Sequence, residues 1–235
     1  MQTLPPNETL IAERLWIPAD TQAILWDMDG VLIDSLSLYL IICNQFLGQH
    51  FGNHVSITKD FFLSIAAYEP AKLLGLILAF VEKNYQIPEA TKLLDKMVTV
   101  FRQRRHDYVI ELHPGISNLL KVAASQTLKM AVVSNNPTAD IKSILKRTDI
   151  ADYFENIIGN DIQQVAKKPA PDTYLLAAQL LNVQPEKCVV IEDTLIGMEA
   201  GYKAGCYTIG VATGGADFET LKQSQWAHQV YPSFI

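Results

Sequence analysis

The chain has 235 residues, of which 49% are hydrophobic and 19% charged, so it holds enough apolar material for a folded core and intrinsic disorder is excluded. Its net charge of −6 excludes a general nucleic-acid binder, because such a protein needs a basic surface to neutralise phosphates. Three widely spaced cysteines, no apolar signal core and no bilayer-length apolar run predict a soluble, cytoplasmic protein with no membrane partner.

In chain order, the first twenty residues are expected to form an N-terminal arm with a short helix around Glu8–Leu15. Beyond the arm, short apolar runs without polar alternation predict strands that are buried on both faces of a parallel sheet. The expected strands are Ala23–Trp26, Met130–Val133, Asn156–Ile158, Val189–Ile191 and Tyr207–Val211. The amphipathic segments expected as helices are Ile116–Ser125, Pro137–Lys146, Pro171–Leu181 and Leu195–Ala204. This alternation predicts a doubly wound α/β sheet, whose strand order cannot be read from one sequence.

Residues 36–111 interrupt the alternation, because they show helical periods and no convincing strand. The helices expected there are Ser37–Leu47, Lys59–Ala67, Ala71–Asn84 and Glu89–Tyr108. We therefore expect an α/β core made of residues 1–35 and 112–235, with residues 36–111 as an inserted all-helical domain.

Two aspartates two positions apart, Asp27 and Asp29, follow the first expected strand of the core. Alternate side chains of an extended segment point the same way, so both carboxylates are expected at one place. Isolated buried carboxylates are unfavourable, which indicates a cation, a proton or a catalytic role beside them. An acidic helix cap would explain one aspartate but not the pair. Gly30 permits the sharp backbone turn that follows.

Polar residues also follow later strands. Ser134 and Asn135 come after the second strand, where a hydroxyl and backbone N–H groups can hold an anion or simply cap the next helix. Lys168 precedes a rigid Pro-Ala-Pro turn and is interpreted as a fixed positive charge, the alternative being an ordinary surface lysine. Glu192 and Asp193 follow the fourth strand, and helix capping again explains only one of them.

Because the carboxyl ends of parallel strands meet at one edge of the sheet, these carboxylates, the hydroxyl and the lysine are expected to converge there. Oxygen ligands without a cysteine or histidine cluster favour Mg²⁺. The same groups are the parts of a phosphoryl-transfer site. The chain has no glycine-rich Walker loop, which argues against a nucleotide-triphosphate motor.

The order and spacing of these segments closely resemble the haloacid dehalogenase (HAD) superfamily, over residues 21 to about 215. The matching segments, in order, are DMDGVLIDS (Asp27–Ser35), VVSNN, KKPAPD and VVIEDTLIGMEAG. The helical insertion resembles that superfamily's small helical cap, and HPGISNLL resembles its return to the core. The resemblance therefore implies a HAD-like α/β core with an inserted helical cap domain.

The resemblance implies a role for each matching residue. Asp27 would be the nucleophile that forms an aspartyl-phosphate, and Asp29 would protonate the leaving oxygen and then activate water. Ser134, the Asn135 amide and Lys168 would hold the transferred phosphoryl group.

Mg²⁺ is the cofactor that the resemblance implies. Its ligands would be the carboxylates of Asp27 and Asp193 and the main-chain carbonyl of Asp29, with Glu192 binding directly or through water. Several carboxylates in one pocket repel, since two charges 4 Å apart interact by about 4 kcal/mol at an effective dielectric of 20. The cation and Lys168 would offset that repulsion.

Departures from the family pattern narrow the function. Asp29 argues against the dehalogenase branch, which lacks an acid there. Members similar to β-phosphoglucomutase carry a histidine in the first cap helix, where this chain has Tyr39. The cap's specificity loop is expected near residues 64–70, with Tyr39 and Tyr68 as substrate-binding residues, and its nearest cation is Lys72. A mutase and a phosphoglycolate phosphatase both become less favoured.

The resemblance thus implies a Mg²⁺-dependent phosphatase for a small phosphomonoester such as a sugar phosphate. A phosphosugar mutase is the alternative at the same site, and a non-catalytic binding or regulatory protein on the same fold is the alternative of another class. The expected partner is a small phosphorylated substrate, without nucleic acid, and the expected assembly is a monomer or small homo-oligomer.

Overall fold

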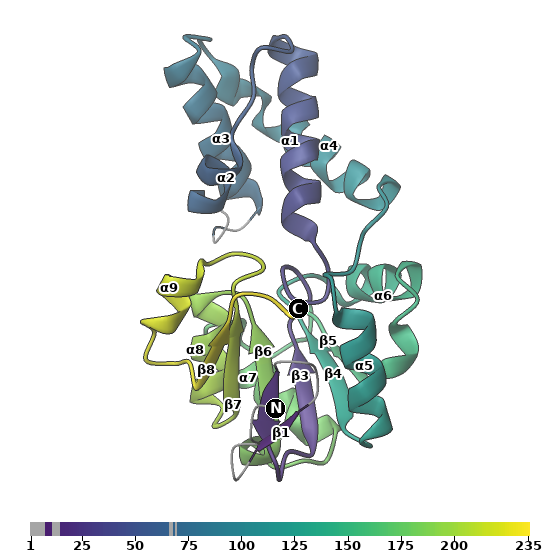
Figure 1. Ribbon diagram of the computed structural model, residues 1–235. Helices are drawn as coiled ribbons and strands as arrows, with labels where there is room; N and C mark the ends of the chain where they lie inside the picture. Colours follow the sequence, from purple (N-terminus) through teal and green to yellow (C-terminus); the bar gives the residue numbers. More distant parts are fainter. Residues whose placement is uncertain (1–7, 11–14, 66–67, 69) are drawn as a thin grey trace. The chain divides into compact units, whose positions relative to one another are not determined.

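The computed structural model describes residues 8–10, 15–65, 68 and 70–235 (Figure 1). The chain divides into two compact units. The first unit is made of Met1–Asp34 and Ile110–Ile235, and the second is Ser35–Val109. No helix within the described ranges is both long and apolar enough to cross a membrane.

Within the described residues, six parallel strands form the sheet of the first unit, in the order β5-β4-β3-β6-β7-β8. The strands are β3 (Ala23–Trp26), β4 (Lys129–Val133), β5 (Asn156–Ile158), β6 (Cys188–Glu192), β7 (Tyr207–Val211) and β8 (Gln229–Tyr231). β3 and β6 lie at the centre of the sheet and are buried at every position, as expected for apolar runs without alternation. β8 was not predicted, because this half-buried edge strand has no apolar run.

Helices cover both faces of this sheet, so the predicted doubly wound α/β fold is confirmed. The helices are α5 (Ile116–Ser125), α6 (Thr138–Arg147), α7 (Asp172–Leu180), α8 (Leu195–Lys203) and α9 (Phe218–Lys222), the last too short to have been predicted. α7 and α8 share a core cluster on one face, and Figure 1 shows α5 on the opposite face. Along the chain, strands are added outward from β3 on one side and from β6 on the other. The carboxyl ends of β3 and β6 therefore form a topological switch point, where open α/β sheets bind ligands.

The expected helix around Glu8–Leu15 is wrong for the part that the structure describes. β1 (Glu8–Leu10) pairs antiparallel with β2 (Trp16–Pro18), while residues 11–14 lie outside the described residues. Leu15 and Ile17 are buried whereas Trp16 is only half-buried. That alternation is the two-residue period of a strand.

The second unit is helical among its described residues. Its elements are α1 (Ser35–Phe51), α2 (Lys59–Ile65), α3 (Pro70–Asn84), a 3₁₀ turn (Ala90–Leu93) and α4 (Leu94–Asp107). α4 packs against both α1 and α3. The expected single helix Glu89–Tyr108 is divided, because Glu89 has a left-handed backbone (φ 65°) and the 3₁₀ turn precedes α4.

The two chain segments that lead to the helical unit pair with each other inside the first unit. The Asp34 N–H donates to the Glu111 carbonyl at 3.0 Å, and the His113 N–H donates to the Leu32 carbonyl at 3.0 Å. A bridge between Ile33 and Leu112 joins them between these bonds.

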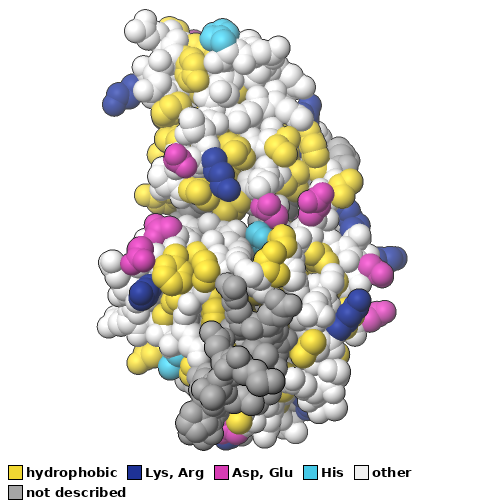
Figure 2. Space-filling view, in the orientation of Figure 1, with side chains coloured by type: hydrophobic (Ala, Val, Ile, Leu, Met, Phe, Trp, Pro, Cys, Tyr) yellow, Lys and Arg dark blue, Asp and Glu magenta, His cyan; other side chains and the backbone are white. Residues whose placement is uncertain are grey.

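On the face drawn in Figure 2, Lys and Arg side chains are scattered among acidic and uncharged ones.

Candidate active site

Four predicted site residues meet where β3 and β6 end. Asp27 directly follows β3, Glu192 is the last residue of β6, and Asp193 comes next. Lys168 reaches the same place from the loop between β5 and α7. All four side chains are buried, although each carries an ionisable group. Burial of that kind requires compensation between the charges.

Lys168 lies between two carboxylates. Its Nζ donates to Asp27 Oδ1 and to Glu192 Oε1, both at 2.6 Å, and to the Val133 carbonyl at 2.8 Å. An ammonium group has three protons, and each of them has an acceptor here. Burial alone would lower the pKa of Lys168, but the charges of Asp27 and Glu192 outweigh it and hold the pKa above its usual range. The lysine is therefore a fixed positive charge.

Both carboxylate oxygens of Glu192 accept hydrogen bonds from the chain. Oε1 accepts from Lys168 and from the Tyr174 hydroxyl, the latter at 2.9 Å. Oε2 accepts from the Asp193 and Thr194 N–H groups at 3.2 and 3.3 Å and from the Thr194 hydroxyl at 3.0 Å. Glu192 is thus held in one orientation. Burial, followed by the charges of Glu192 and Asp27, raises the pKa of Tyr174 well above its usual value, so its hydroxyl stays a donor.

Asp193 is held on one side only. Its Oδ2 accepts from the Gly215 N–H at 2.6 Å, while the buried Oδ1 has no hydrogen-bond partner in the part of the chain that the structure describes. The backbone approaches Asp193 closely at two glycines. A Cβ added to Gly30 or Gly214 would lie 2.2 or 1.9 Å from Oδ2, and Gly30 also has a positive φ of 80°.

The buried carboxylates carry more negative charge than Lys168 compensates. Asp27, Glu192 and Asp193 offer oxygens that lie within 4.8 Å of one another. Ionised together, they leave two negative charges beyond the single lysine. Burial and then the Glu192 charge raise the pKa of Asp27 well above its usual value, and they raise that of Asp193 to about 8. An oxygen-only donor set with an excess of two negative charges and an unpartnered Oδ1 fits a hard divalent cation.

Asp29 and Ser134 lie at the same edge and are joined by a residue that was not predicted. The Asn136 side-chain N–H₂ donates to Asp29 Oδ2 and, at 3.1 Å, to Ser134 Oγ. Asn135, by contrast, has an exposed side chain, and its carbonyl accepts from the Asn160 side chain.

Tyr39 and Tyr68 belong to the helical unit. Tyr39 of α1 is half-buried, with its ring centroid 4.9 Å from that of Phe101. Tyr68 is 44% exposed, and Lys72 Nζ lies 4.0 Å from its ring centroid. Residues 66, 67 and 69 of the predicted specificity loop lie outside the described residues.

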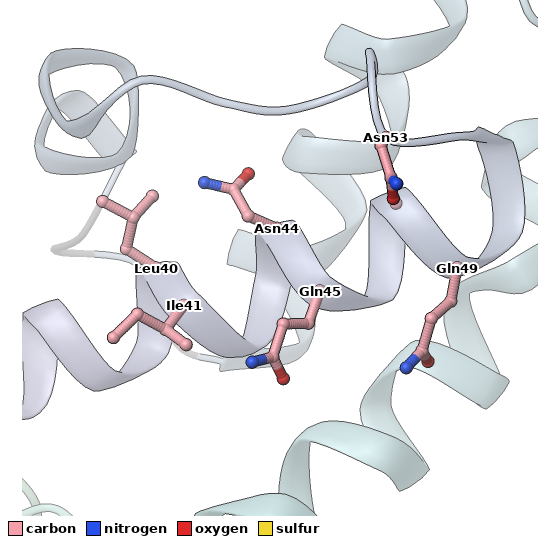
Figure 3. Close-up of a pocket in the computed structure, with 7 residues that line it drawn as sticks. Leu40, Ile41, Asn44, Gln45, Gln49 and Asn53 are labelled. Carbon is pink, nitrogen blue, oxygen red and sulfur yellow. The ribbon is translucent and has the colours of Figure 1, made fainter.

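A groove of about 570 Å³ runs along α1 in the helical unit (Figure 3). Among the described residues that line it, none is charged and none is a predicted site residue. The amide side chains that line the groove also form hydrogen bonds within the helical unit. Asn44 bonds the backbone N–H and C=O of Ile57 at 2.8 and 3.1 Å, and Gln45 and Gln49 accept from Arg104 at 2.6 and 3.3 Å.

Tyr174, Asn136 and the Thr213–Gly215 loop were missed by sequence reasoning. Thr213 donates its hydroxyl to the Gly30 carbonyl at 2.6 Å, so this loop after β7 supports the turn behind Asp29. The paired glycines after a strand were the signal that could have found it. Gly197 was not predicted as a site residue either, although a Cβ there would lie 1.9 Å from the Glu192 carboxyl group.

Comparisons with known proteins place this geometry in a family. The model of the family described as haloacid dehalogenase-like hydrolase matches residues 24–211. A phosphorylated carbohydrates phosphatase of Thermotoga maritima is 30% identical over 215 residues, which cover 91% of this chain and 96% of that protein. A phosphoglycolate phosphatase of Escherichia coli strain K12 is 26% identical over 222 residues, covering 88% and 87%.

Solved structures share the fold over about nine tenths of this chain. A Thermotoga maritima protein assigned as a β-phosphoglucomutase has a TM-score of 0.71 at 27% identity, covering 90% of this chain and 94% of that one. A HAD family hydrolase from Deinococcus radiodurans, solved with phosphate and sodium, has a TM-score of 0.77 at 23% identity, covering 92% and 93%.

Replacing Gly197 with alanine is expected to displace the Glu192 carboxylate, because the added Cβ would overlap it. Overpacking of this kind costs about 1–3 kcal/mol of the free energy of unfolding. The matched control is Gly75→Ala in α3, where the added Cβ would lie 3.8 Å from Leu94 Cδ2, an ordinary contact. That change is expected to be neutral or to stabilise by up to about 1 kcal/mol. Urea unfolding of both variants measures the difference, and equal stabilities would contradict the crowding at Glu192.

Proposed function

Since this chain belongs to the haloacid dehalogenase-like hydrolase family, we propose that it is a Mg²⁺-dependent phosphatase acting on a small phosphorylated metabolite through an aspartyl-phosphate. The observation that carries the proposal is the position of Lys168 between Asp27 and Glu192, with the Asp193 carboxylate beside them. These groups supply a nucleophile, a fixed cation and a metal-binding carboxylate. They lie at the switch point of the sheet.

Asp27 is the proposed nucleophile. One of its carboxylate oxygens attacks phosphorus, the P–O bond to the leaving group breaks, and Asp29 gives its proton to the leaving oxygen. Asp29 then takes a proton from a water molecule whose oxygen attacks the same phosphorus, which releases phosphate and restores the Asp27 carboxylate. A carboxylate is a weak nucleophile, so the rate depends on position and on charge stabilisation.

The phosphoryl group carries the charge that must be stabilised. We propose that Lys168, the Ser134 hydroxyl and the Asn135 backbone N–H hold it. Ser134 is held in place because its N–H donates to the Ile158 carbonyl at 3.0 Å and its Oγ accepts from Asn136. A donor that is fixed before the reaction needs no reorganisation when charge develops.

The residues around Asp193 fit Mg²⁺, which when bound would act as a Lewis acid on the phosphoryl oxygens. We propose the carboxylates of Asp27 and Asp193 and the main-chain carbonyl of Asp29 as its ligands. Both oxygens of Glu192 already accept hydrogen bonds from the chain. We therefore propose that Glu192 contributes negative charge near Mg²⁺ or binds the ion through a water molecule. Burial and then the Glu192 charge raise the pKa values of Asp27 and Asp193, and a bound cation would offset both effects.

Substrate choice is assigned to the helical unit, since the catalytic groups proposed above all come from the α/β unit. We propose that residues 36–111 act as a cap, in which Tyr39 and Tyr68 contact the substrate. A sugar phosphate or a related phosphomonoester is the proposed substrate class, supported by the name of the Thermotoga maritima relative at 30% identity.

A phosphosugar mutase is the second candidate function. It is favoured by the likeness to the Thermotoga maritima structure assigned as a β-phosphoglucomutase. Incubation with a set of sugar phosphates and Mg²⁺ separates the two functions. Release of inorganic phosphate supports the phosphatase, whereas isomerisation of the sugar phosphate without net release supports the mutase.

Asp27→Asn is expected to abolish phosphate release, with a loss above about 10³-fold, because it removes the nucleophile. Asp29→Asn should still allow slow phosphorylation of Asp27 by p-nitrophenyl phosphate, whose leaving group needs no proton. Intact-mass measurement should then find the phosphorylated chain in Asp29→Asn. It should not find it in the double variant that carries both Asp27→Asn and Asp29→Asn. Wild-type turnover by Asp27→Asn would refute the covalent mechanism.

Activity is expected to vanish with a chelator and to return with Mg²⁺, while Ca²⁺ inhibits because it prefers looser and higher coordination. Mg²⁺ should also raise the stability of the wild type, by about 2.7 kcal/mol at a concentration of about 100 times its Kd. Asp193→Asn should lose this stabilisation. Without metal, the same variant should be at least as stable as the wild type, because a neutral amide avoids the cost of burying a carboxyl group whose pKa is raised to about 8. Full activity after exhaustive metal removal would refute the assignment.

Tyr39→Ala and Tyr68→Ala are expected to change the relative kcat/KM values among large and small phosphomonoesters. Their melting temperatures should change less, since Tyr68 is exposed and Tyr39 is only half-buried. Tyr85→Phe, an exchange elsewhere in the helical unit, is the control for nonspecific effects. If both alanine variants keep the wild-type order of substrates, these tyrosines do not set substrate choice.

A further inference from the structure

Tyr174 is a buried polar group that the proposed mechanism does not use. It lies on α7, and its side chain is fully buried beneath the site. A buried phenol requires a hydrogen-bond partner, and the Tyr174 hydroxyl donates to Glu192 Oε1 at 2.9 Å. Its ring also lies under Lys168, with Nζ 4.8 Å from the ring centroid. Tyr174 therefore contacts both members of the Lys168–Glu192 pair.

The hydrogen bonds around the Lys168–Glu192 pair form one connected network. The Lys168 ammonium donates one hydrogen bond each to Asp27, Glu192 and the Val133 carbonyl. Glu192 Oε1 accepts two hydrogen bonds, one from Lys168 and one from the Tyr174 hydroxyl. Without the phenol, this oxygen would keep Lys168 as its single donor among the described residues. A buried carboxylate oxygen that loses a donor attracts the remaining cation more strongly.

We propose that Tyr174 is a positioning residue, which holds Glu192 so that the Lys168 ammonium stays shared with Asp27. The inference rests on the proposed phosphatase function, in which Lys168 neutralises the phosphoryl group beside the nucleophile. Loss of the hydroxyl is expected to draw Lys168 toward Glu192 and away from Asp27. The chemical step should then slow, while contacts to the rest of the substrate remain.

The test is the Tyr174→Phe variant, which keeps the ring and the volume and removes one hydroxyl. Steady-state assays with p-nitrophenyl phosphate and Mg²⁺ should show kcat lowered about tenfold and KM changed less than about twofold. Tyr202→Phe is the matched control, because Tyr202 lies on the neighbouring helix α8 with an exposed side chain, and it should retain wild-type values.

A double-variant cycle separates positioning from packing. If Tyr174 acts through Glu192, Tyr174→Phe should change kcat less than about twofold when Glu192→Gln is already present. If the losses of kcat in Tyr174→Phe and Glu192→Gln multiply in the variant that carries both changes, the proposal is overturned. A wild-type kcat in Tyr174→Phe would also overturn it.

A crystal structure of Tyr174→Phe decides the inference even if the wild type has no phosphatase activity, a result that would refute the proposed function instead. Withdrawal of Lys168 Nζ from Asp27, or rotation of the Glu192 carboxylate, supports the positioning role. A Lys168–Glu192 pair in its wild-type place overturns it.

Discussion

The buried ion pairs of Lys168 are the interaction on which the rest of the site depends. One ammonium compensates two carboxylates, Asp27 at the end of β3 and Glu192 at the end of β6. Each carboxylate would be unfavourable in this place without it, because burial disfavours a lone charge. The pairs also join the two central strands to the loop before α7. The same contacts therefore hold together the switch point of the sheet and the proposed catalytic groups.

The backbone around the site is shaped to let the acidic side chains approach one another. Gly30 and Gly214 come close to Asp193, and Gly197 leaves room for the Glu192 carboxylate. A side chain at any of these positions would overlap a carboxylate oxygen. The carboxylates are consequently held in place although they repel, and that stored repulsion favours the binding of a divalent cation.

Much of this arrangement could be predicted from the sequence, for a physical reason. Four strands are largely apolar and buried on both faces, namely β3, β4, β6 and β7. The charged or polar residues that follow these strands in the sequence must therefore lie at one edge of the sheet. Lys168 and Asp27 were expected at the same edge, but the direct bonds of one ammonium group to both Asp27 and Glu192 depend on side-chain orientations that the sequence does not specify. Tyr174 was not predicted as a site residue, because the role of its hydroxyl depends on the contact with Glu192. The N-terminal hairpin was missed because its strands are three residues long, too short to show a period.

The central claim is that Asp27 receives a phosphoryl group while Lys168 neutralises it. A crystal structure of the protein with Mg²⁺ and beryllium trifluoride, which mimics a phosphoryl group bound to a carboxylate, tests this claim most directly. Beryllium is expected to bond to an Asp27 carboxylate oxygen, with its fluorines contacting Lys168, Ser134 and the Asn135 N–H. Beryllium trifluoride bound to another carboxylate, or an unmodified Asp27 under saturating conditions, would contradict it.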